Sequence, residues 1–325
     1  MDLDTRVLIP FLRANGQFVS GASIAEELQL SRVSVHKHLE HLKTSGFTFS
    51  AIRNKGYQLT REPVAFHPVL FEALLAIQPC SFFEDHIALG EVDSTNTVAE
   101  RELSSGRPTP FFVVADCQTA GRGRRGRNWH SPQHKNLYLS IALRPSLPPS
   151  RLQTITLWLG LRLCQLLRDT YSLPVQIKWP NDLLIHGRKI AGMLTEARVD
   201  SEFTRDLVFG LGLNVNTSET DFPEELHSIA SSLSMNLGQP LNLSRIAHRI
   251  VHHLSDAIQD YLNEDYADEL AHLWPEFDFL RGQGISTEQA EGTAVGITRN
   301  GSLRVEREDG SIAILHSGEV SLRKS

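Results

Sequence analysis

The spacing of apolar residues changes twice along this chain of 325 residues, and these changes constrain its fold more than any other feature. Apolar residues first follow a helical spacing, then helical and strand-like stretches mix, and short alternating stretches make up the last part. A chain of this length is enough for two or three folded units. The sequence therefore predicts an α+β protein with parts at residues 1–62, 67–276 and 277–325.

The first part, residues 1–62, is predicted to be mostly helical. Three apolar runs at helical spacing each end at a stop signal, and Ser20 and Ser31 precede the second and third runs as expected N-caps. Pro10 lies inside the first run and is expected to kink or shorten that helix. Residues 47–59 then predict a hairpin. Two short helices followed by such a wing are typical of a helix-turn-helix that reads DNA.

The charge of this part supports a DNA-binding role. Residues 31–61 carry six Lys or Arg and one acidic residue, so their net charge is +5 in a chain whose net charge is −6. Outward side chains of the second of the two helices are expected to meet bases and phosphates. The predicted DNA-binding residues are Arg32, Ser34, His36 and Lys37 on the helix and Arg53 and Lys55 on the wing. The alternative is a helical protein-interaction module whose cations are merely solvated.

Strands follow one another in the middle part without a helix between each pair, which argues against regular βαβ winding and for an α+β domain. The expected strands are 111–115, 137–143, 175–179, 190–199 and 207–215, and the expected helices are 152–167, 244–262 and 267–274. In the last part, Asn300-Gly301 and Asp309-Gly310 are strong hairpin signals. They predict a small β barrel.

The stretch 121–129, Gly-Arg-Gly-Arg-Arg-Gly-Arg-Asn-Trp, is the most informative for chemistry. It formally satisfies G-x-G-x-x-G, but a dinucleotide fold needs a following helix and an acid about 20 residues on. No Asp or Glu occurs in 117–168, and Pro132 blocks a helix. Glycines let backbone N–H groups approach a ligand, and arginines add forked donors. The loop is therefore predicted to bind phosphate or carboxylate; the alternative is a flexible arginine-rich segment for nucleic acid.

A second polar cluster follows a predicted strand at residues 178–182, Lys-Trp-Pro-Asn-Asp, and continues at 188–192, Arg-Lys-Ile-Ala-Gly. A lysine at such a sheet edge could hold an anionic group, although an isolated lysine is more often solvated surface. Residues 93–96 and 210–216 are weaker signals, because Ser, Thr and Asn at a helix start usually act as caps.

Other classes of site are disfavoured by what the sequence lacks. The three cysteines, Cys80, Cys117 and Cys164, are far apart and form no C-x-x-C pair, which argues against disulfides and against a zinc site. No Walker loop, nucleophile elbow or H-E-x-x-H motif occurs, so covalent catalysis and a resident metal are not expected. No apolar stretch approaches the roughly 18 residues of a membrane helix, and the start of the chain lacks a signal-peptide pattern. A cytosolic protein without membrane contact is expected.

Taken together, the motifs resemble those of the biotin protein ligases, in particular the bifunctional kind that also represses the biotin operon. The resemblance covers nearly the whole chain. The motifs that carry it, in order, are Asp93–Asn96, Gln118–Arg124, Lys178–Asp182, Arg188–Gly192 and Gly318–Arg323. The implied fold is a winged helix-turn-helix, a central mixed-sheet ligase domain related to class II synthetase and lipoate ligase cores, and a C-terminal SH3-like β barrel.

The resemblance implies a ligase that works in two steps. Biotin and ATP, which arrives with Mg²⁺, would give biotinyl-5′-adenylate, and a lysine of the biotin carboxyl carrier protein would then attack the acyl group. The implied biotin-binding residues are Ser94, Thr95, Asn96, Gln118, Arg122, Gly123, Arg124 and Lys189; those binding ATP or adenylate are Arg124, Arg127, Trp129, Lys189 and Asn214; and the catalytic residues are Arg124, Lys189 and Asp182. The implied partners include operator DNA, which would be bound by a homodimer with the adenylate as corepressor.

Two other functions compete with this interpretation. A transcription regulator that senses a small acid without catalysis would keep the basic helix and wing but would not need Lys189 or Asp182 for activity. A lipoate-type ligase or acyltransferase would have a similar core, but the arginine-glycine loop and the Lys178–Asp182 motif make it a poorer match.

Overall fold

The computed structural model describes residues 1–200, 202–264 and 266–323. The chain divides into two compact units. The first unit holds residues 1–81 and 240–251, and the second holds residues 82–239 and 252–325.

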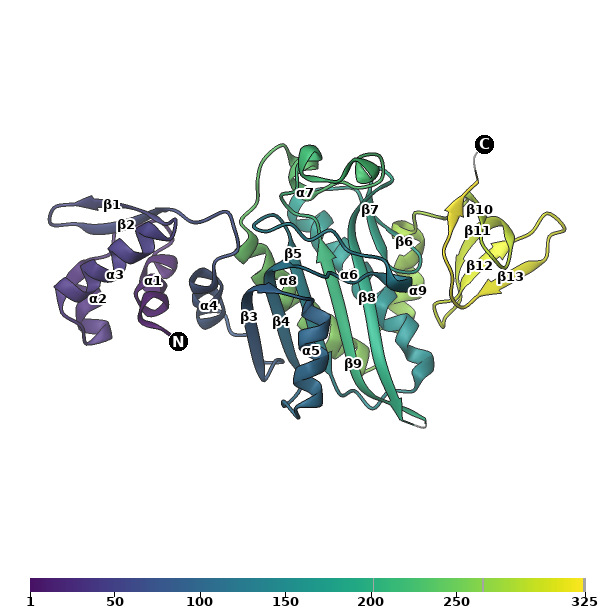
Figure 1. Ribbon diagram of the computed structural model, residues 1–325, viewed down its shortest axis with the longest axis horizontal. Helices are drawn as coiled ribbons and strands as arrows, with labels where there is room; N and C mark the ends of the chain where they lie inside the picture. The colour runs from purple at the N-terminus through teal and green to yellow at the C-terminus, as the bar shows by residue number, and fades with distance from the viewer. Residues whose placement is uncertain (201, 265, 324–325) are drawn as a thin grey trace. The chain divides into compact units, whose positions relative to one another are not determined.

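The first unit begins with three helices and a two-stranded hairpin (Figure 1). These elements are α1 (Leu3–Arg13), α2 (Gly21–Leu28), α3 (Arg32–Thr44), β1 (Thr48–Ile52) and β2 (Gly56–Arg61). Helix α4 (Pro68–Ile77) and the beginning of α8 (Leu243–Leu262) complete the unit. The three predicted helices and the hairpin are confirmed.

Local signals explain where these helices begin. The Ser20 hydroxyl accepts a hydrogen bond from the Ala22 backbone N–H, and the Ser31 hydroxyl accepts one from that of Ser34 at 3.0 Å. Helix α1 continues through Pro10 to Arg13, so the proline does not shorten it. Side chains from all three helices and from β1 form a common apolar core, in which the Phe11 and Phe49 rings lie 5.0 Å apart, edge to face.

The hairpin is attached to the helices through its backbone. Val19 and Tyr57 exchange two backbone hydrogen bonds of 2.7 and 2.9 Å, which join the connection between α1 and α2 to β2. Gly56 has a φ of +103°, and a Cβ there would lie 2.1 Å from the Val19 carbonyl oxygen. Only glycine fits this position, so the wing could not form here with a larger residue.

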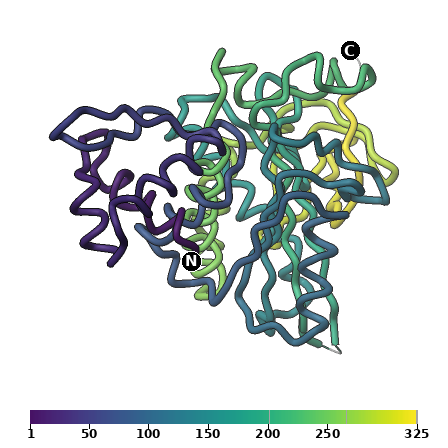
Figure 2. Tube along the Cα trace, turned by 60° about the vertical axis from the view of Figure 1, so that its left-hand side comes forward, coloured from purple at the N-terminus to yellow at the C-terminus, as the bar shows by residue number. Residues whose placement is uncertain are grey.

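The second unit is built on a mixed seven-stranded sheet with the order β3-β4-β5-β9-β8-β7-β6. Its strands are β3 (Asp85–Val92), β4 (Phe111–Gln118), β5 (Leu137–Leu143), β6 (Val175–Lys178), β7 (Asp182–Ile185), β8 (Arg188–Asp200) and β9 (Phe203–Leu213). Only the β3–β4 pair is parallel among these seven strands. The long strands β8 and β9 run side by side in both views of the chain (Figures 1 and 2). All five predicted strands are confirmed, whereas β3 and β7 were not anticipated.

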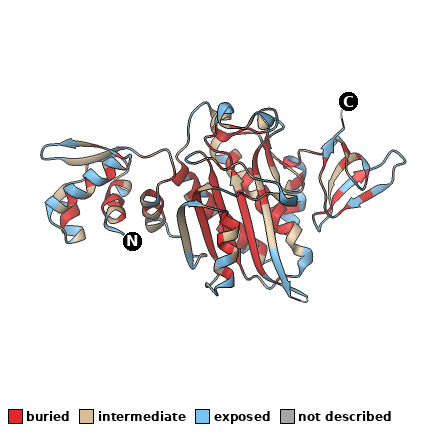
Figure 3. Cartoon of the chain, viewed as in Figure 1, coloured by how far each residue is buried: buried red, intermediate tan, exposed pale blue. Residues whose placement is uncertain are grey.

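Helices cover both faces of this sheet. Helix α5 (Thr95–Ser104) lies on one face, and α6 (Leu152–Tyr171) lies on the other with the second half of α8 (Figure 1). The Trp158 indole N–H of α6 donates to the Ala257 carbonyl of α8 at 2.7 Å, and Trp158 is fully buried. Helices α7 (Leu233–Leu237) and α9 (Ala267–Phe277) complete this part. Because both faces are covered, every residue of β5 is buried (Figure 3).

The end of the chain forms an antiparallel sheet of five strands with the order β13-β12-β11-β10-β14. The strands are β10 (Gly284–Ser286), β11 (Glu291–Ile297), β12 (Leu303–Glu306), β13 (Ile312–Leu315) and β14 (Ser321–Leu322). Gly301 and Gly310 occupy the two predicted turns with φ values of +77° and +80°. The buried Trp179 donates its indole N–H to the Gly301 carbonyl at 2.9 Å and so ties this sheet to the central one.

No helix within the three described stretches is long and apolar enough to cross a membrane.

Candidate functional site

One pocket in the second unit, with a volume of about 580 Å³, collects the predicted ligand-binding residues. It lies over the face of the central sheet that carries α5. Every residue predicted to bind biotin, ATP or adenylate, or to act in catalysis, lines it: Ser94, Thr95, Asn96, Gln118, Arg122, Gly123, Arg124, Arg127, Trp129, Asp182, Lys189 and Asn214. The structure therefore brings together residues that are up to 120 positions apart in the chain.

The floor of the pocket is made of glycines on β8 and β9. A Cβ at Gly212 would lie 2.4 Å from the Trp129 indole nitrogen, and one at Gly192 would lie 2.9 Å from the same ring. A Cβ at Gly210 would lie 2.2 Å from Asn96 Oδ1. The glycines thus leave room for the Trp129 ring and the Asn96 amide to rest directly on the sheet.

One end of the pocket is polar and neutral. Thr95 donates through its backbone N–H and its hydroxyl to Gln118 Oε1, at 2.9 and 3.2 Å. Ser140 Oγ lies 2.8 Å from Thr95 Oγ1 and also contacts Asn96 Oδ1. Ser94, Thr95 and Asn96 are all buried, at 2–4% exposure. This end offers oriented donors and acceptors to a neutral polar group.

Ser140 was not predicted as a site residue. It lies in the middle of the apolar strand β5 and is fully buried. A single hydroxyl within a buried apolar strand must find a polar partner. A single Ser within an apolar stretch was therefore the sequence signal from which Ser140 could have been recognised as a site residue.

The arginine-glycine loop is folded on itself beside this end. Trp129 N–H donates to the Gly121 carbonyl at 2.8 Å, and Gly123 N–H donates to the Arg127 carbonyl at 2.7 Å. A short 3₁₀ turn, Arg124–Gly126, lies between these bonds. The backbone bonds close the loop, so its four arginine side chains point in defined directions.

Arg124 points into the pocket. Its Nη1 donates to Asn181 Oδ1 at 3.1 Å, and burial lowers the pKa of its guanidinium. A partly buried cation whose hydrogen-bond partner is a neutral amide retains its attraction for an anion. Arg124 is therefore suited to bind a carboxylate or phosphate here.

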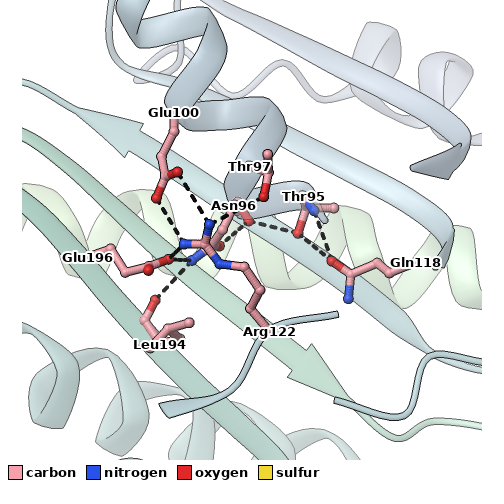
Figure 4. Close-up of polar contacts among 9 residues, drawn as sticks. Thr95, Asn96, Thr97, Glu100, Gln118, Arg122, Leu194 and Glu196 are labelled. Carbon is pink, nitrogen blue, oxygen red and sulfur yellow. Dashed lines mark hydrogen bonds and ion pairs between the residues drawn. The ribbon is translucent and has the colours of Figure 1, made fainter. Parts of the chain in front are cut away.

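Arg122 points to a pair of carboxylates instead. Its Nη2 forms an ion pair with Glu100 Oε1 at 2.9 Å and a second one with Glu196 Oε2 (Figure 4). Its side chain still lines the pocket. Neither glutamate was anticipated as part of the site, because α5 and β8 meet only through the tertiary fold.

Lys189 and Asp182 form the opposite, charged wall. Lys189 Nζ lies 2.7 Å from Asp182 Oδ1 and 5.2 Å from the centre of the Trp129 ring. The two residues come from β8 and β7, which pair antiparallel with Asp182 opposite Gly192 and Lys189 opposite Leu184. The lysine side chain therefore reaches along the strand pair to the carboxylate. The Lys178–Asp182 and Arg188–Gly192 motifs therefore belong to one surface, as predicted.

Asn214 is held behind this wall. It is buried at 3% exposure, its Nδ2 donates to the Ser231 carbonyl at 3.0 Å, and its Oδ1 accepts from Asn136 Nδ2 at 3.3 Å. The Trp129 indole N–H is buried and has no hydrogen-bond partner among the described residues.

The predicted DNA-binding residues lie in the first unit. Arg32, His36 and Lys37 are exposed on α3 and Ser34 is partly exposed, while Val35, Leu39 and Leu42 face the core. Arg53 and Lys55 are exposed in the turn between β1 and β2. The exposed face of α3 and the tip of the wing thus carry the cations, as expected of a surface that binds phosphate.

Comparisons with known proteins agree with this arrangement. Residues 5–58 match the HTH domain family, residues 89–214 match the biotin/lipoate A/B protein ligase family, and residues 283–323 match the biotin protein ligase C terminal domain. The solved structure titled "Biotin protein ligase from Aquifex aeolicus in complex with biotin and ATP" aligns with a TM-score of 0.64 and 30% identity. It covers 75% of this chain and 100% of that one.

Two curated relatives match over nearly the whole chain. The "Bifunctional ligase/repressor BirA" of Bacillus subtilis is 32% identical over 317 residues, which covers 96% of both chains. The protein of the same name from Escherichia coli is 31% identical over 323 residues, or 97% of this chain and 96% of that one.

The fold and the pocket define a biotin protein ligase with an amino-terminal DNA-binding domain. The chain belongs to the family of the bifunctional ligase/repressor BirA. This confirms the family resemblance found in the sequence.

Two exposed arginines of the loop are bound by connections between strands of the C-terminal sheet. Arg125 pairs with Glu288 at 3.0 Å, and Arg127 pairs with Glu319 at 2.6 Å. Exposed ion pairs are individually weak, but these two act on neighbouring residues of one loop. They are expected to shift the loop toward its closed form.

Replacing both glutamates, Glu288→Gln with Glu319→Gln, should therefore make the loop more accessible. We expect trypsin to cleave after Arg125 or Arg127 several-fold faster in the double variant, because proteolysis tracks the open population. Peptide mass mapping of a digestion time course measures this. Glu308→Gln is the matched control, since Glu308 lies in the turn between β12 and β13 and pairs with Arg323, outside the loop. Equal cleavage rates in all three proteins would show that the pairs do not hold the loop.

Proposed function

We propose that this chain is an ATP-dependent ligase that joins biotin to one lysine of the biotin carboxyl carrier protein. In the first step the biotin carboxylate attacks the α-phosphorus of MgATP, giving biotinyl-5′-adenylate and pyrophosphate. In the second step the amine of the carrier lysine attacks the acyl carbon and AMP leaves. Both ATP and the carrier place this reaction in the cytosol.

One observation carries the proposal: a neutral polar end and a cationic end share the same pocket. The ureido ring of biotin is neutral and polar, which suits Thr95, Asn96 and Gln118. Its carboxylate would then extend toward Arg124 and Lys189. Bringing a carboxylate against a triphosphate requires overcoming repulsion between anions, and preorganised cations are the effective catalysts for this.

The adenine end is assigned to the Trp129 side of the pocket. The Trp129 ring rests on Gly192 and Gly212, and Asn214 lies buried nearby. Lys189, which lies over this ring, would hold the acyl-phosphate oxygens. Arg127 lines the outer rim, and its side chain is 71% exposed.

Asp182 would act on the incoming lysine. A carboxylate can orient an amine or accept its proton, and the amine must lose a proton to attack. Asp182 pairs with Lys189 in the structure. Once Lys189 turns to the phosphate oxygens, Asp182 is released to meet the carrier lysine.

The experiment that tests this function is mass spectrometry of a biotin carboxyl carrier domain incubated with the protein, biotin and MgATP. We expect the biotinyl mass on one carrier lysine. Lys189→Ala should slow the labelling about 100-fold or more, because it removes a cation from a developing charge. The matched control is Lys135→Ala, since Lys135 pairs with Asp221 outside the pocket.

The same assay separates the competing functions. A protein that only senses a small acid would leave the carrier unlabelled at any enzyme concentration. Label from lipoate in place of biotin would assign the chain to lipoate transfer.

Two of the three glycines of the pocket floor should separate the two substrates. In Gly210→Ala the added methyl group would clash with Asn96, and the KM for biotin should rise about tenfold. In Gly212→Ala the added methyl group would clash with Trp129, and the KM for ATP should rise instead. Pyrophosphate exchange with each substrate varied in turn measures both constants. In the control Gly90→Ala the added Cβ meets nothing within 4 Å. Equal effects on both substrates in both variants would contradict this assignment of the two ends.

We further propose that the chain represses biotin synthesis with the adenylate as corepressor. One helix-turn-helix reads a half-site, so specific repression requires a two-fold dimer on an inverted repeat. Ordering of the loop by adenylate could complete a dimer face. Ligand, dimer and DNA would then share one reciprocal coupling free energy. The carrier would compete with the second protomer for the same surface.

DNA affinity should accordingly rise with biotinyl-adenylate and fall as unmodified carrier is added. Titration of a labelled promoter fragment from a biotin-synthesis operon, with and without adenylate, measures this. Lys37→Ala and Arg53→Ala should each reduce the slope of log affinity against log salt concentration by about one, as expected for phosphate contacts. Arg13→Ala is the control, because Arg13 is exposed on α1 and pairs with Glu27. Equal affinity with and without adenylate would exclude the corepressor role.

A further inference from the structure

A glutamate outside all the predicted motifs lies against the polar end of the pocket. On β8, Met193 and Thr195 face α6: a Cβ at Gly160 of α6 would touch Met193, and Thr195 bonds to Thr156. Because side chains alternate along a strand, Glu196 faces the other way, toward α5, where it meets Asn96 and Arg122 of the pocket. Figure 4 shows its carboxylate between Asn96 and Arg122.

The same carboxylate oxygen binds both of these ligand-site residues. Glu196 Oε2 accepts a hydrogen bond from Asn96 Nδ2 at 2.7 Å and forms the ion pair with Arg122 Nη2. A carboxylate can only accept, so the Asn96 amide nitrogen must face Glu196. Asn96 Oδ1 is thereby turned toward Ser140. Glu196 thus fixes the orientation of the Asn96 amide, with its nitrogen toward Glu196 and its oxygen toward Ser140.

Glu100 holds Arg122 from the other element. Glu100 and Asn96 are four residues apart on α5 and therefore share one face of the helix. The Arg122 guanidinium donates to Glu100 Oε1 at 2.9 Å, to Glu100 Oε2 at 3.3 Å and to Thr97 Oγ1 at 3.3 Å. Two parallel bonds to one carboxylate fix the plane of the guanidinium as well as its position.

These contacts leave Arg122 poorly suited to attract an anion. One guanidinium faces two carboxylates, so the cluster carries a net charge of −1, and the two glutamates raise the pKa of Arg122. The three side chains are each about one-third exposed, so water screens them only in part. The charge of a bound carboxylate or phosphate would thus be met mainly by Arg124 and Lys189.

We propose that Glu196 and Glu100 are positioning residues of the biotin pocket. They act through Arg122 and Asn96: they orient the Asn96 amide for a neutral ureido group and anchor the start of the arginine-glycine loop against α5. Arg122 belongs to this support and not to the charge clamp. This inference rests on the proposed function, because it assigns the polar end to biotin.

The test compares Glu196→Gln and Glu100→Gln with the wild-type full-length protein. Titration calorimetry with biotin alone measures the dissociation constant, and single-turnover adenylation measures the rate at saturating biotin and MgATP. We expect Glu196→Gln to weaken biotin binding about tenfold or more, because a charge-assisted contact to a buried amide is lost. The rate at saturation should change less than about threefold. Glu100→Gln should weaken binding less, because Asn96 keeps its partner.

Glu102→Gln is the matched control. Glu102 lies on the same helix and pairs with an arginine at 2.9 Å, but that arginine is Arg107, which does not line the pocket. The Glu102→Gln variant should bind biotin with the same affinity as the wild type.

A double-mutant cycle separates positioning from direct contact and does not depend on any single variant. If Glu196 acts in part through Arg122, Glu196→Gln should weaken biotin binding less in an Arg122→Gln background than in the wild type. Wild-type affinity in Glu196→Gln, or a loss confined to the saturated rate, would overturn the inference. A wild-type protein that binds no biotin would instead overturn the proposed function.

Discussion

A loop with four arginines in seven residues can bind one anion selectively only if the charges of the other arginines are already balanced. The fold achieves this with carboxylates from separate elements: Glu100 and Glu196 bind Arg122, Glu288 binds Arg125, and Glu319 binds Arg127. Of the four, Arg124 has a neutral hydrogen-bond partner, Asn181, and is partly buried. Its charge is therefore the one left for a ligand, and desolvation makes that charge more effective. The remaining pairs give the loop a single arrangement.

The central sheet supports this arrangement because its strands alternate between two environments. On β8 and β9, the residues that face α6 pack in the interior, and they are either apolar or small and polar. The opposite face carries glycines where the Trp129 ring and the Asn96 amide rest, Leu194 in the pocket lining, and Glu196 where the loop is anchored. A shift of the register by one residue would exchange the two sets. The same hydrogen-bonded pairing that stabilises the sheet thus also determines the geometry of the site.

Local signals made much of this predictable from sequence. The caps at Ser20 and Ser31 located the helices of the first unit, and the turns at Gly301 and Gly310 located the terminal hairpins. Strand β3 was missed because it shows no clean alternation of buried and exposed residues. The predicted ligand-binding residues could be found from motifs, and Ser140 could have been found as a single hydroxyl in an apolar strand, whereas Glu100 and Glu196 could not be found. Their roles arise only when α5, β5 and β8 come together, and no short pattern in the chain records that contact.

The pair between Lys189 and Asp182 suggests why the two proposed half-reactions occur in order. While Lys189 neutralises Asp182, the carboxylate offers little attraction to the ammonium group of a carrier lysine. The adenylate phosphate competes for Lys189, and an unpaired carboxylate that is only 25% exposed is costly to leave without a partner. That cost favours binding of the acceptor only after the reactive acyl group has formed. One lysine would then serve as the cation for the first step and, by leaving Asp182, as the signal for the second.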